Sequence, residues 1–322
     1  MANQQCHAPG ISRRTALRAI GAITATAVLP SIAACKARCD NVALNKSLKG
    51  RIKQVPANWC FTGQASSQPW TLTELLENTE KLGMPGVELL PPDKWHLLKE
   101  RGMVCAATPS HPFKHGMNNL GLHEETTAKL KTAIKASADA GFPCVMTFTG
   151  MADTSKNSEF PHAKGSKVSA DEGMANCIAG YKKVAPYAAD LGVSMVLEPL
   201  NSRDPANMKG HPGYQGDNVD YCAKIVREVD SPGLKLLFDV YHVQIMHGDL
   251  VRRIHENKDI IGHVQIAGNP GRGPLGLDQE INYRAVMQAF LDIGYDGYVG
   301  HEWIPTGNPF EQLKQGVAIC DV

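Results

Sequence analysis

The sequence predicts a single α/β domain folded as a (β/α)8 barrel. Eight short apolar runs alternate with helix-like segments over roughly 270 residues, which is the count and the length that such a barrel needs. Four of the later runs also carry one oxygen-bearing side chain near their ends. An open doubly wound sheet would alternate in the same way, but no glycine-rich nucleotide-binding turn follows the first strand.

The individual elements follow from the periodicity of the apolar residues. The expected strands cover residues 51–61, 86–90, 103–108, 142–149, 193–201, 236–242, 260–267 and 298–305. The expected helices cover residues 71–82, 93–101, 122–140, 169–191, 218–229, 250–257 and 283–293, with a last helix from about residue 309. Thr71 and Glu74 form a capping box at a helix start, and Gly141 is placed to end a helix.

The run over 236–242 shows why the strand ends matter. Asp239 lies near the end of this apolar run, where we expect a loop to follow at once. A buried carboxylate is tolerated there only if it is paired, and a metal ion is one such partner. In a TIM barrel the carboxyl ends of the strands share one mouth, so Glu198, Asp239, Gln265 and Glu302 are expected to converge.

These four side chains form an all-oxygen ligand set with a charge near −3. Mn²⁺ and Mg²⁺ suit such ligands, and Zn²⁺ could also enter. The alternative is that each acid caps a helix or pairs with a nearby arginine, which is common for one acid but less plausible for four in equivalent positions.

Composition excludes several classes of function. The chain has a formal net charge of +1, which lacks the basic footprint of a nucleic-acid-binding protein. It contains no apolar run of the roughly 18 residues that a membrane span requires. Cys60, Cys105 and Cys144 fall in apolar runs and are expected to be buried, without a CxxC or zinc-type spacing.

The first 47 residues are expected to lie outside the fold. The segment Ser12–Leu17 contains paired arginines before a modestly apolar stretch, which resembles a twin-arginine export signal. Cys35 ends a lipobox-like sequence and would be the lipidated residue of a membrane-anchored lipoprotein. We therefore expect a periplasmic protein whose domain spans residues 48–322, with an ordinary basic lead-in as the alternative for residues 1–47.

The chain resembles the hydroxypyruvate isomerase branch of the xylose isomerase-like sugar isomerases and epimerases. The motifs that carry the resemblance are 58–61 (NWCF), 196–201 (VLEPLN), 238–242 (FDVYH), 263–267 (HVQIA), 269–272 (NPGR), 280–283 (EINY) and 300–303 (GHEW). The resemblance implies a metal held by Glu198, Asp239, Gln265 and Glu302. Ketose epimerases of this family usually have histidine at the third ligand position. The hydroxypyruvate isomerase branch has glutamine there, as this chain does at Gln265.

The resemblance also implies roles in catalysis and substrate binding. Glu198 and Glu302 would flank the substrate as an acid–base pair, while His242 and Arg272 would hold substrate oxygens. His211, in a polar loop after the fifth strand, and Glu88, at the end of the second, are further candidates for substrate binding. The alternatives are a hydrogen-bonded histidine for His242, solvated loop residues for Arg272 and His211, and a structural ion pair for Glu88.

The sequence therefore favours a metal-dependent aldose–ketose isomerase or epimerase that acts on a small hydroxy-carbonyl compound through an enediolate. The expected partner is a sugar or a hydroxy-keto acid and not nucleic acid, and assembly as a homo-oligomer stays open. One alternative is a phosphodiesterase resembling endonuclease IV, which would need a basic surface and a multi-histidine zinc cluster. Another is a non-catalytic sugar-binding lipoprotein on the same scaffold.

Overall fold

The computed structural model describes residues 48–154 and 167–322, in which eight strands alternate with helices. The strands are β1 Lys53–Pro56, β2 Gly86–Val87, β3 Val104–Cys105, β4 Cys144–Thr147, β5 Ser194–Leu197, β6 Leu234–Asp239, β7 Ile261–Ile266 and β8 Tyr298–His301. Every predicted strand is present, although each is shorter than its apolar run. The expected export signal and Cys35 lie outside the described residues.

The eight strands form one closed parallel barrel. Six of them hydrogen-bond in the order β1-β8-β7-β6-β5-β4, and β2 pairs with β3. Two single parallel bridges complete the ring, because Ala57 pairs with Glu88 between β1 and β2 and Thr108 pairs with Val145 between β3 and β4. Each strand is thus a neighbour of the next one in sequence. This arrangement confirms the predicted (β/α)8 barrel.

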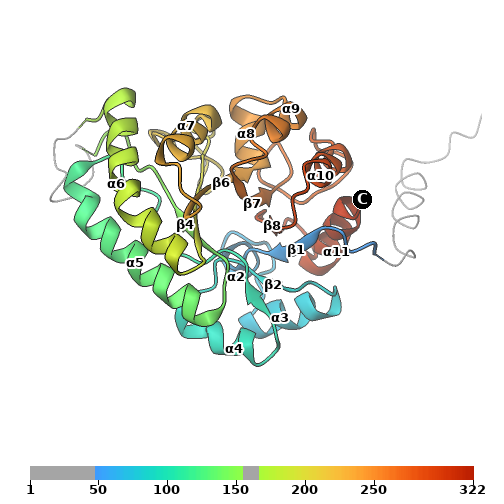
Figure 1. Ribbon diagram of the computed structural model, residues 1–322. Coiled ribbons are helices and arrows are strands. Elements are labelled where there is room, and N and C mark those ends of the chain that lie inside the picture. The colour runs from blue at the N-terminus through green and yellow to red at the C-terminus, as the bar shows by residue number, and fades with distance from the viewer. Residues whose placement is uncertain (1–47, 155–166) are drawn as a thin grey trace, which may run out of the picture. The chain divides into compact units, whose positions relative to one another are not determined.

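Helices surround the strands (Figure 1). They are α2 Asn58–Thr62, α3 Leu72–Lys81, α4 Trp95–Lys99, α5 His123–Ala140, α6 Ala170–Asp190, α7 Val219–Val229, α8 Val240–Met246, α9 Leu250–Glu256, α10 Tyr283–Asp292 and α11 Pro309–Cys320. Short 3₁₀ helices occupy Pro92–Lys94 and Leu120–Leu122. Across the described ranges, no helix has the length and apolar character needed to cross a bilayer.

The predicted helix ends are confirmed in detail. The Thr71 hydroxyl accepts from the Glu74 backbone N–H, and the Glu74 carboxylate accepts from the Thr71 backbone N–H at 2.7 Å, which is a complete capping box. Gly141 follows α5 with φ of 76°, a left-handed conformation that a residue with a Cβ adopts at a cost.

Two local predictions were wrong. The run 51–61 is not one strand, because helix α2 begins at Asn58. No loop follows Asp239 either. The Asp239 side chain accepts from the His242 backbone N–H at 3.0 Å and so caps helix α8, which starts directly after the strand. His242 is therefore a helix residue, held next to the strand end by this cap.

Alternation along the strands separates the two faces of the barrel wall. Leu236 and Phe238 of β6 pack in the main core with the helices, so Leu237 and Asp239 face the barrel interior. Leu237 forms a small interior cluster with Ala107, Cys144, Met146 and Val196. The predicted burial of the cysteines is confirmed, and Cys60, Cys105 and Cys144 are free thiols.

Candidate active site and metal centre

Glu198 and Asp239 meet at the carboxyl-terminal mouth of the barrel. Glu198 directly follows β5 and Asp239 ends β6, and these side chains belong to residues only 3% and 2% exposed. Ligand atoms of Glu198, Asp239 and His242 lie within 4.8 Å of one another. Two predicted ligands from neighbouring strands are thus brought to one buried point.

Gln265 lies level with Asp239 on the next strand. The two residues are register partners between β6 and β7, and Gln265 is completely buried. Its Nε2 donates to Glu88 Oε1 at 2.9 Å, whereas its Oε1 has no hydrogen-bond partner among the described residues. An amide whose nitrogen is held by a carboxylate keeps its oxygen free for another partner.

Glu302, the fourth predicted ligand, directly follows β8 and is held by two donors. Its Oε1 accepts from the Trp59 indole N–H at 2.8 Å, and its Oε2 accepts from Arg272 Nη2 at 2.5 Å. Each carboxylate oxygen has a second lone pair, so these bonds leave acceptor capacity. Glu302 is thus fixed in orientation by groups from two other segments.

Arg272 is locked against the protein. It is 2% exposed and adopts a left-handed φ of 53°. Besides Glu302, its guanidinium donates to the Met208 carbonyl at 2.6 Å. The guanidinium carbon lies 5.1 Å from the ring centroid of Trp59 and 5.8 Å from that of Tyr241, within reach of cation–π attraction. In this structure Arg272 is therefore no solvated loop cation: it is the counter-ion of Glu302.

The hydrogen bonds of His242 define its tautomer. Its Nδ1 accepts from the Asn201 backbone N–H at 2.9 Å, and a backbone amide can only donate. Nδ1 is therefore unprotonated, and the proton of the neutral ring is on Nε2. Nε2 is buried and has no hydrogen-bond partner within the described part of the chain. This geometry makes His242 a hydrogen-bond donor into the site and disfavours it as a metal ligand, since coordination through Nε2 would require an imidazolate.

His211 lies beside His242 at the mouth. Its ring centroid is 6.2 Å from that of His242 and 4.2 Å from that of Phe113. The residue is 8% exposed, and its backbone N–H donates to the Asn201 carbonyl at 2.7 Å. Burial, together with the positive charge of Arg272, lowers the pKa of His211 to about 4. The ring is thus neutral at pH 7 and close to the predicted substrate position.

Glu88 occupies a different environment from the other candidates. It is completely buried inside the barrel, and both carboxylate oxygens are engaged. His263 Nε2 lies 2.7 Å from Oε2, and Gln265 Nε2 lies 2.9 Å from Oε1. The structure therefore places Glu88 against the Gln265 side chain, hydrogen-bonded to His263 within the barrel.

Electrostatics explain why this mouth favours a cation. Burial, and then the neighbouring charges of Glu302 and Asp239, raise the pKa of Glu198 well above its usual range. Burial likewise raises the pKa of Asp239 to about 6 and that of Glu302 to about 7, although Arg272 opposes both shifts. When ionised, the three carboxylates have one buried guanidinium as counter-charge. A divalent cation would balance the remaining two negative charges.

Two residues that shape the site received no role from the sequence. Trp59 orients Glu302, and Asn201 sets the tautomer of His242. Both residues lie in motifs that carry the family resemblance, and this position was the one feature of the sequence that could have indicated a role in the site. Their partners are 243 and 41 residues away along the chain, so no local pattern could connect them.

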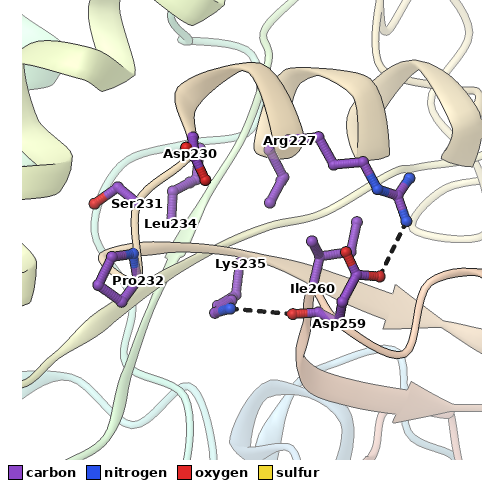
Figure 2. Close-up of a pocket in the computed structure, with 9 residues that line it drawn as sticks. Arg227, Asp230, Ser231, Pro232, Leu234, Lys235, Asp259 and Ile260 are labelled. Atoms are coloured by element: carbon purple, nitrogen blue, oxygen red, sulfur yellow. Dashed lines mark hydrogen bonds and ion pairs between the residues drawn. The ribbon is translucent and has the colours of Figure 1, made fainter.

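A pocket lies at the amino-terminal end of the barrel, opposite the candidate site. A pocket of about 600 Å³ is lined by Leu234, the first residue of β6, and by the end of α7. Figure 2 shows that its cations are paired: Arg227 bonds the Asp259 carboxylate and Lys235 bonds the Asp259 carbonyl, each at 3.2 Å. Because active sites of such barrels lie at the opposite, carboxyl-terminal face, this pocket is not the candidate site.

The fold and the mouth define a class of proteins, the parallel barrels with a carboxylate-rich site at the ends of strands five to eight. Residues 76–321 match the family described as xylose isomerase-like TIM barrel, and the chain belongs to this family.

Curated relatives of this chain are isomerases. It is 25% identical over 245 residues to the hydroxypyruvate isomerase of Escherichia coli, covering 71% of this chain and 86% of that protein. It is 35% identical over 148 residues to the 2-oxo-tetronate isomerase of Cupriavidus necator, covering 45% of this chain. The chain spans about half the length of this second relative, since the aligned region covers 54% of that protein.

Solved structures share the fold. A family 2 AP endonuclease from Brucella melitensis superposes with a TM-score of 0.66 at 24% identity, covering 81% of this chain and 97% of that one. A 3-keto-D-glucoside 4-epimerase from E. coli superposes with a TM-score of 0.64 at 19% identity, covering 83% and 97%. At these identities the structural similarity establishes the fold alone, so the reaction must be inferred from the residues of the site.

Proposed function

We propose that this protein is a metal-dependent isomerase or epimerase of a small hydroxy-carbonyl compound, of the kind that hydroxypyruvate isomerase represents. One observation carries the proposal. Glu198 Oε1 and Gln265 Oε1 are buried and unpartnered within residues 48–154 and 167–322; Glu198 lies beside the Asp239 carboxylate, and Gln265 is the register partner of Asp239 on β7. Buried polar atoms are normally satisfied, so these two free oxygen atoms next to Asp239 support a bound cation as their partner.

The donor set fits a hard divalent cation. Glu198, Asp239, Gln265 and Glu302 would hold it through oxygen atoms alone, which suits Mn²⁺ or Mg²⁺ and would also admit Zn²⁺. The bound cation would lower the free energy of negative charge that develops on the substrate oxygens.

The surrounding residues supply the proton transfer. Glu198 offers a carboxylate oxygen free of protein donors, and Glu302 is held in orientation by Trp59 and Arg272. The pKa values of both carboxyl groups are raised toward pH 7, where a carboxyl group can both accept and return a proton. Moving a proton between adjacent carbons through an enediolate therefore lies within the chemistry of this pair.

The remaining candidates would bind the substrate. The His242 Nε2–H is placed to donate to a substrate oxygen, and His211 lies beside it. Arg272 would contact substrate only through the parts of its guanidinium that Glu302 and Met208 leave free. The substrate we propose is a sugar or a hydroxy-keto acid.

The alternative phosphodiesterase would need a cluster of histidines around zinc. Within the described ranges, one group of three or more His, Cys, Asp or Glu side chains is close enough to share a metal ion. It consists of Glu198, Asp239 and His242, without Glu302, and so contains one histidine. The tautomer of His242 suits it to donate a hydrogen bond and not to coordinate a metal ion. A non-catalytic sugar-binding protein would not need two carboxylates with raised pKa values, so we favour the isomerase.

We further propose that the protein is exported by the twin-arginine route and acts in the periplasm, with Cys35 as the site of lipid attachment. The support is the sequence of residues 12–35. Replacing Arg13 and Arg14 together by lysine in the full chain should retain the protein in the cytoplasm, as measured by fractionation. Unchanged export of this variant would contradict the proposal.

The function is tested by metal analysis and isotope exchange. Purified protein would be assayed for bound divalent metal, and ketoses and hydroxypyruvate would be screened in D₂O by NMR. We expect metal-dependent deuterium uptake at a carbon next to the carbonyl, lost in Glu198→Gln and Glu302→Gln. Glu124→Gln, on the exposed surface of α5, is the matched control and should behave like the wild type. A protein without affinity for divalent cations would refute the proposal.

A further inference from the structure

A column of polar side chains runs through the interior of the barrel below the candidate site. Glu88, His263 and Gln265 are all completely inaccessible to solvent. Glu88 comes from the end of β2, whereas His263 and Gln265 lie two residues apart on β7 and face the same side. The Glu88 carboxylate connects them, with one oxygen 2.7 Å from His263 Nε2 and the other 2.9 Å from Gln265 Nε2.

We propose that Glu88 is a positioning residue that selects the orientation of the Gln265 amide and thereby completes the cation site. This inference rests on the proposed function, because it requires that Gln265 serve as a ligand. An amide can rotate to exchange its oxygen and nitrogen, and only the oxygen can bind a cation. Rotation would bring Gln265 Oε1 against the Glu88 carboxylate, so two acceptors would face each other in a buried space.

The geometry keeps the carboxylate from adapting to a rotated amide. His263 holds one oxygen of Glu88, so the group cannot turn away without breaking a buried hydrogen bond. Gly300, the register partner of Gln265 on β8, leaves the room that the carboxylate fills. A Cβ at Gly300 would lie 2.3 Å from Glu88 Oε2, closer than atoms can approach.

An alternative is that Glu88 acts only through its negative charge, which would attract any cation at the mouth. The two roles predict opposite rankings of two variants. Glu88→Asp keeps the charge but is one methylene too short to reach both His263 and Gln265. Glu88→Gln loses the charge but keeps the length and an oxygen that can accept from Gln265.

The first experiment measures Mn²⁺ binding by isothermal titration calorimetry on the wild type and on both variants, without substrate. Removing the partner of a metal-binding side chain typically weakens metal affinity by about 10- to 100-fold. We expect a loss near the upper end of that range for Glu88→Asp and a smaller loss for Glu88→Gln. Equal affinities in all three proteins, or a weaker Glu88→Gln than Glu88→Asp, would overturn the positioning role.

A third variant disturbs the carboxylate without altering its charge or length. Gly300→Ala would push Glu88 away from its present position, and we expect it to weaken Mn²⁺ binding by about 10-fold or more. Gly273→Ala, whose added Cβ would meet open space, is the matched control. Circular dichroism and thermal melts in EDTA would confirm that each variant is folded, and wild-type affinity in folded Gly300→Ala would also refute the inference.

The outcomes separate this inference from the proposed function. A wild-type protein that binds no Mn²⁺, Mg²⁺ or Zn²⁺ would refute both. A wild-type protein that binds Mn²⁺, together with Glu88 variants that fail the expected ranking, would refute only the role of Glu88.

Discussion

Arg272 donates from Nη2 to Glu302 Oε2 at 2.5 Å, and their side chains are only 3% and 5% exposed. The proposed acid–base carboxylate thus has its own counter-ion within the protein. The two residues are 30 positions apart and lie on the segments that follow β7 and β8. Any change of Arg272 will therefore alter the charge balance at Glu302 as well as contacts with a substrate.

Loss of this pairing should destabilise the metal-free protein. Arg272→Met removes the charge but keeps much of the volume, and it leaves the Glu302 carboxylate buried without its counter-ion. We expect a decrease in the free energy of unfolding of about 3–5 kcal/mol, measured by urea denaturation in EDTA. Arg272→Lys keeps a positive charge and should lose less. A stability of Arg272→Met equal to that of the wild type would contradict the pairing.

His242 should be needed for turnover but not for metal binding. His242→Leu removes the Nε2–H donor, so we expect kcat to fall by about 100-fold or more. Mn²⁺ affinity should stay within a factor of about 3, because the His242 ring is neither a ligand nor the hydrogen-bond partner of a ligand. Loss of such a partner would typically weaken binding by about 10-fold or more. Asp239→Asn is the comparison that should lose metal affinity. A large loss of affinity in His242→Leu would show that the ring is a ligand after all.

Metal removal should lower thermal stability. Because the cation would bind the folded chain and balance buried carboxylates, Mn²⁺ at about 100 times its Kd should add about 2.7 kcal/mol of stability. We expect a lower Tm in EDTA than in Mn²⁺, measured by differential scanning calorimetry. The difference should vanish in Asp239→Asn. An identical Tm with and without Mn²⁺ at saturating concentration would argue against the site.

His111 should make the fold sensitive to acid. Burial lowers its pKa to about 4, and the ring bonds the Thr147 hydroxyl at 3.1 Å. In the unfolded chain the ring has a pKa of about 6.5, so that state binds more protons as the pH falls below 6.5. The stability due to the neutral ring is therefore present at pH 8 and should be about 2 kcal/mol smaller at pH 5.

The corresponding measurement is urea unfolding at several pH values between 5 and 8. His111→Gln should show a shallower loss of stability toward acid than the wild type. His255→Gln, on the exposed surface of α9, is the control and should retain the wild-type slope. Equal slopes for the wild type and His111→Gln would mean that His111 does not titrate as described.

The sequence by itself determined the barrel and the positions of the four predicted ligands. Both depend on local patterns, since apolar periodicity predicts the strands and the parallel barrel places their carboxyl ends together. Glu198, Asp239 and Glu302 were identified because a charged residue at the end of an apolar run is unusual. The short helices that begin at Asn58 and Val240 were missed, because a side-chain cap or a short helix leaves little periodicity to detect.

Only the tertiary structure decided how these residues are connected. The contact between Glu88 and His263 spans 175 residues, and the bond from Trp59 to Glu302 spans 243. The tautomer of His242 depends on one backbone N–H of Asn201. Such relationships arise when distant strands close into a ring, because hydrogen-bond distance and direction are properties of the closed barrel and not of any segment within it.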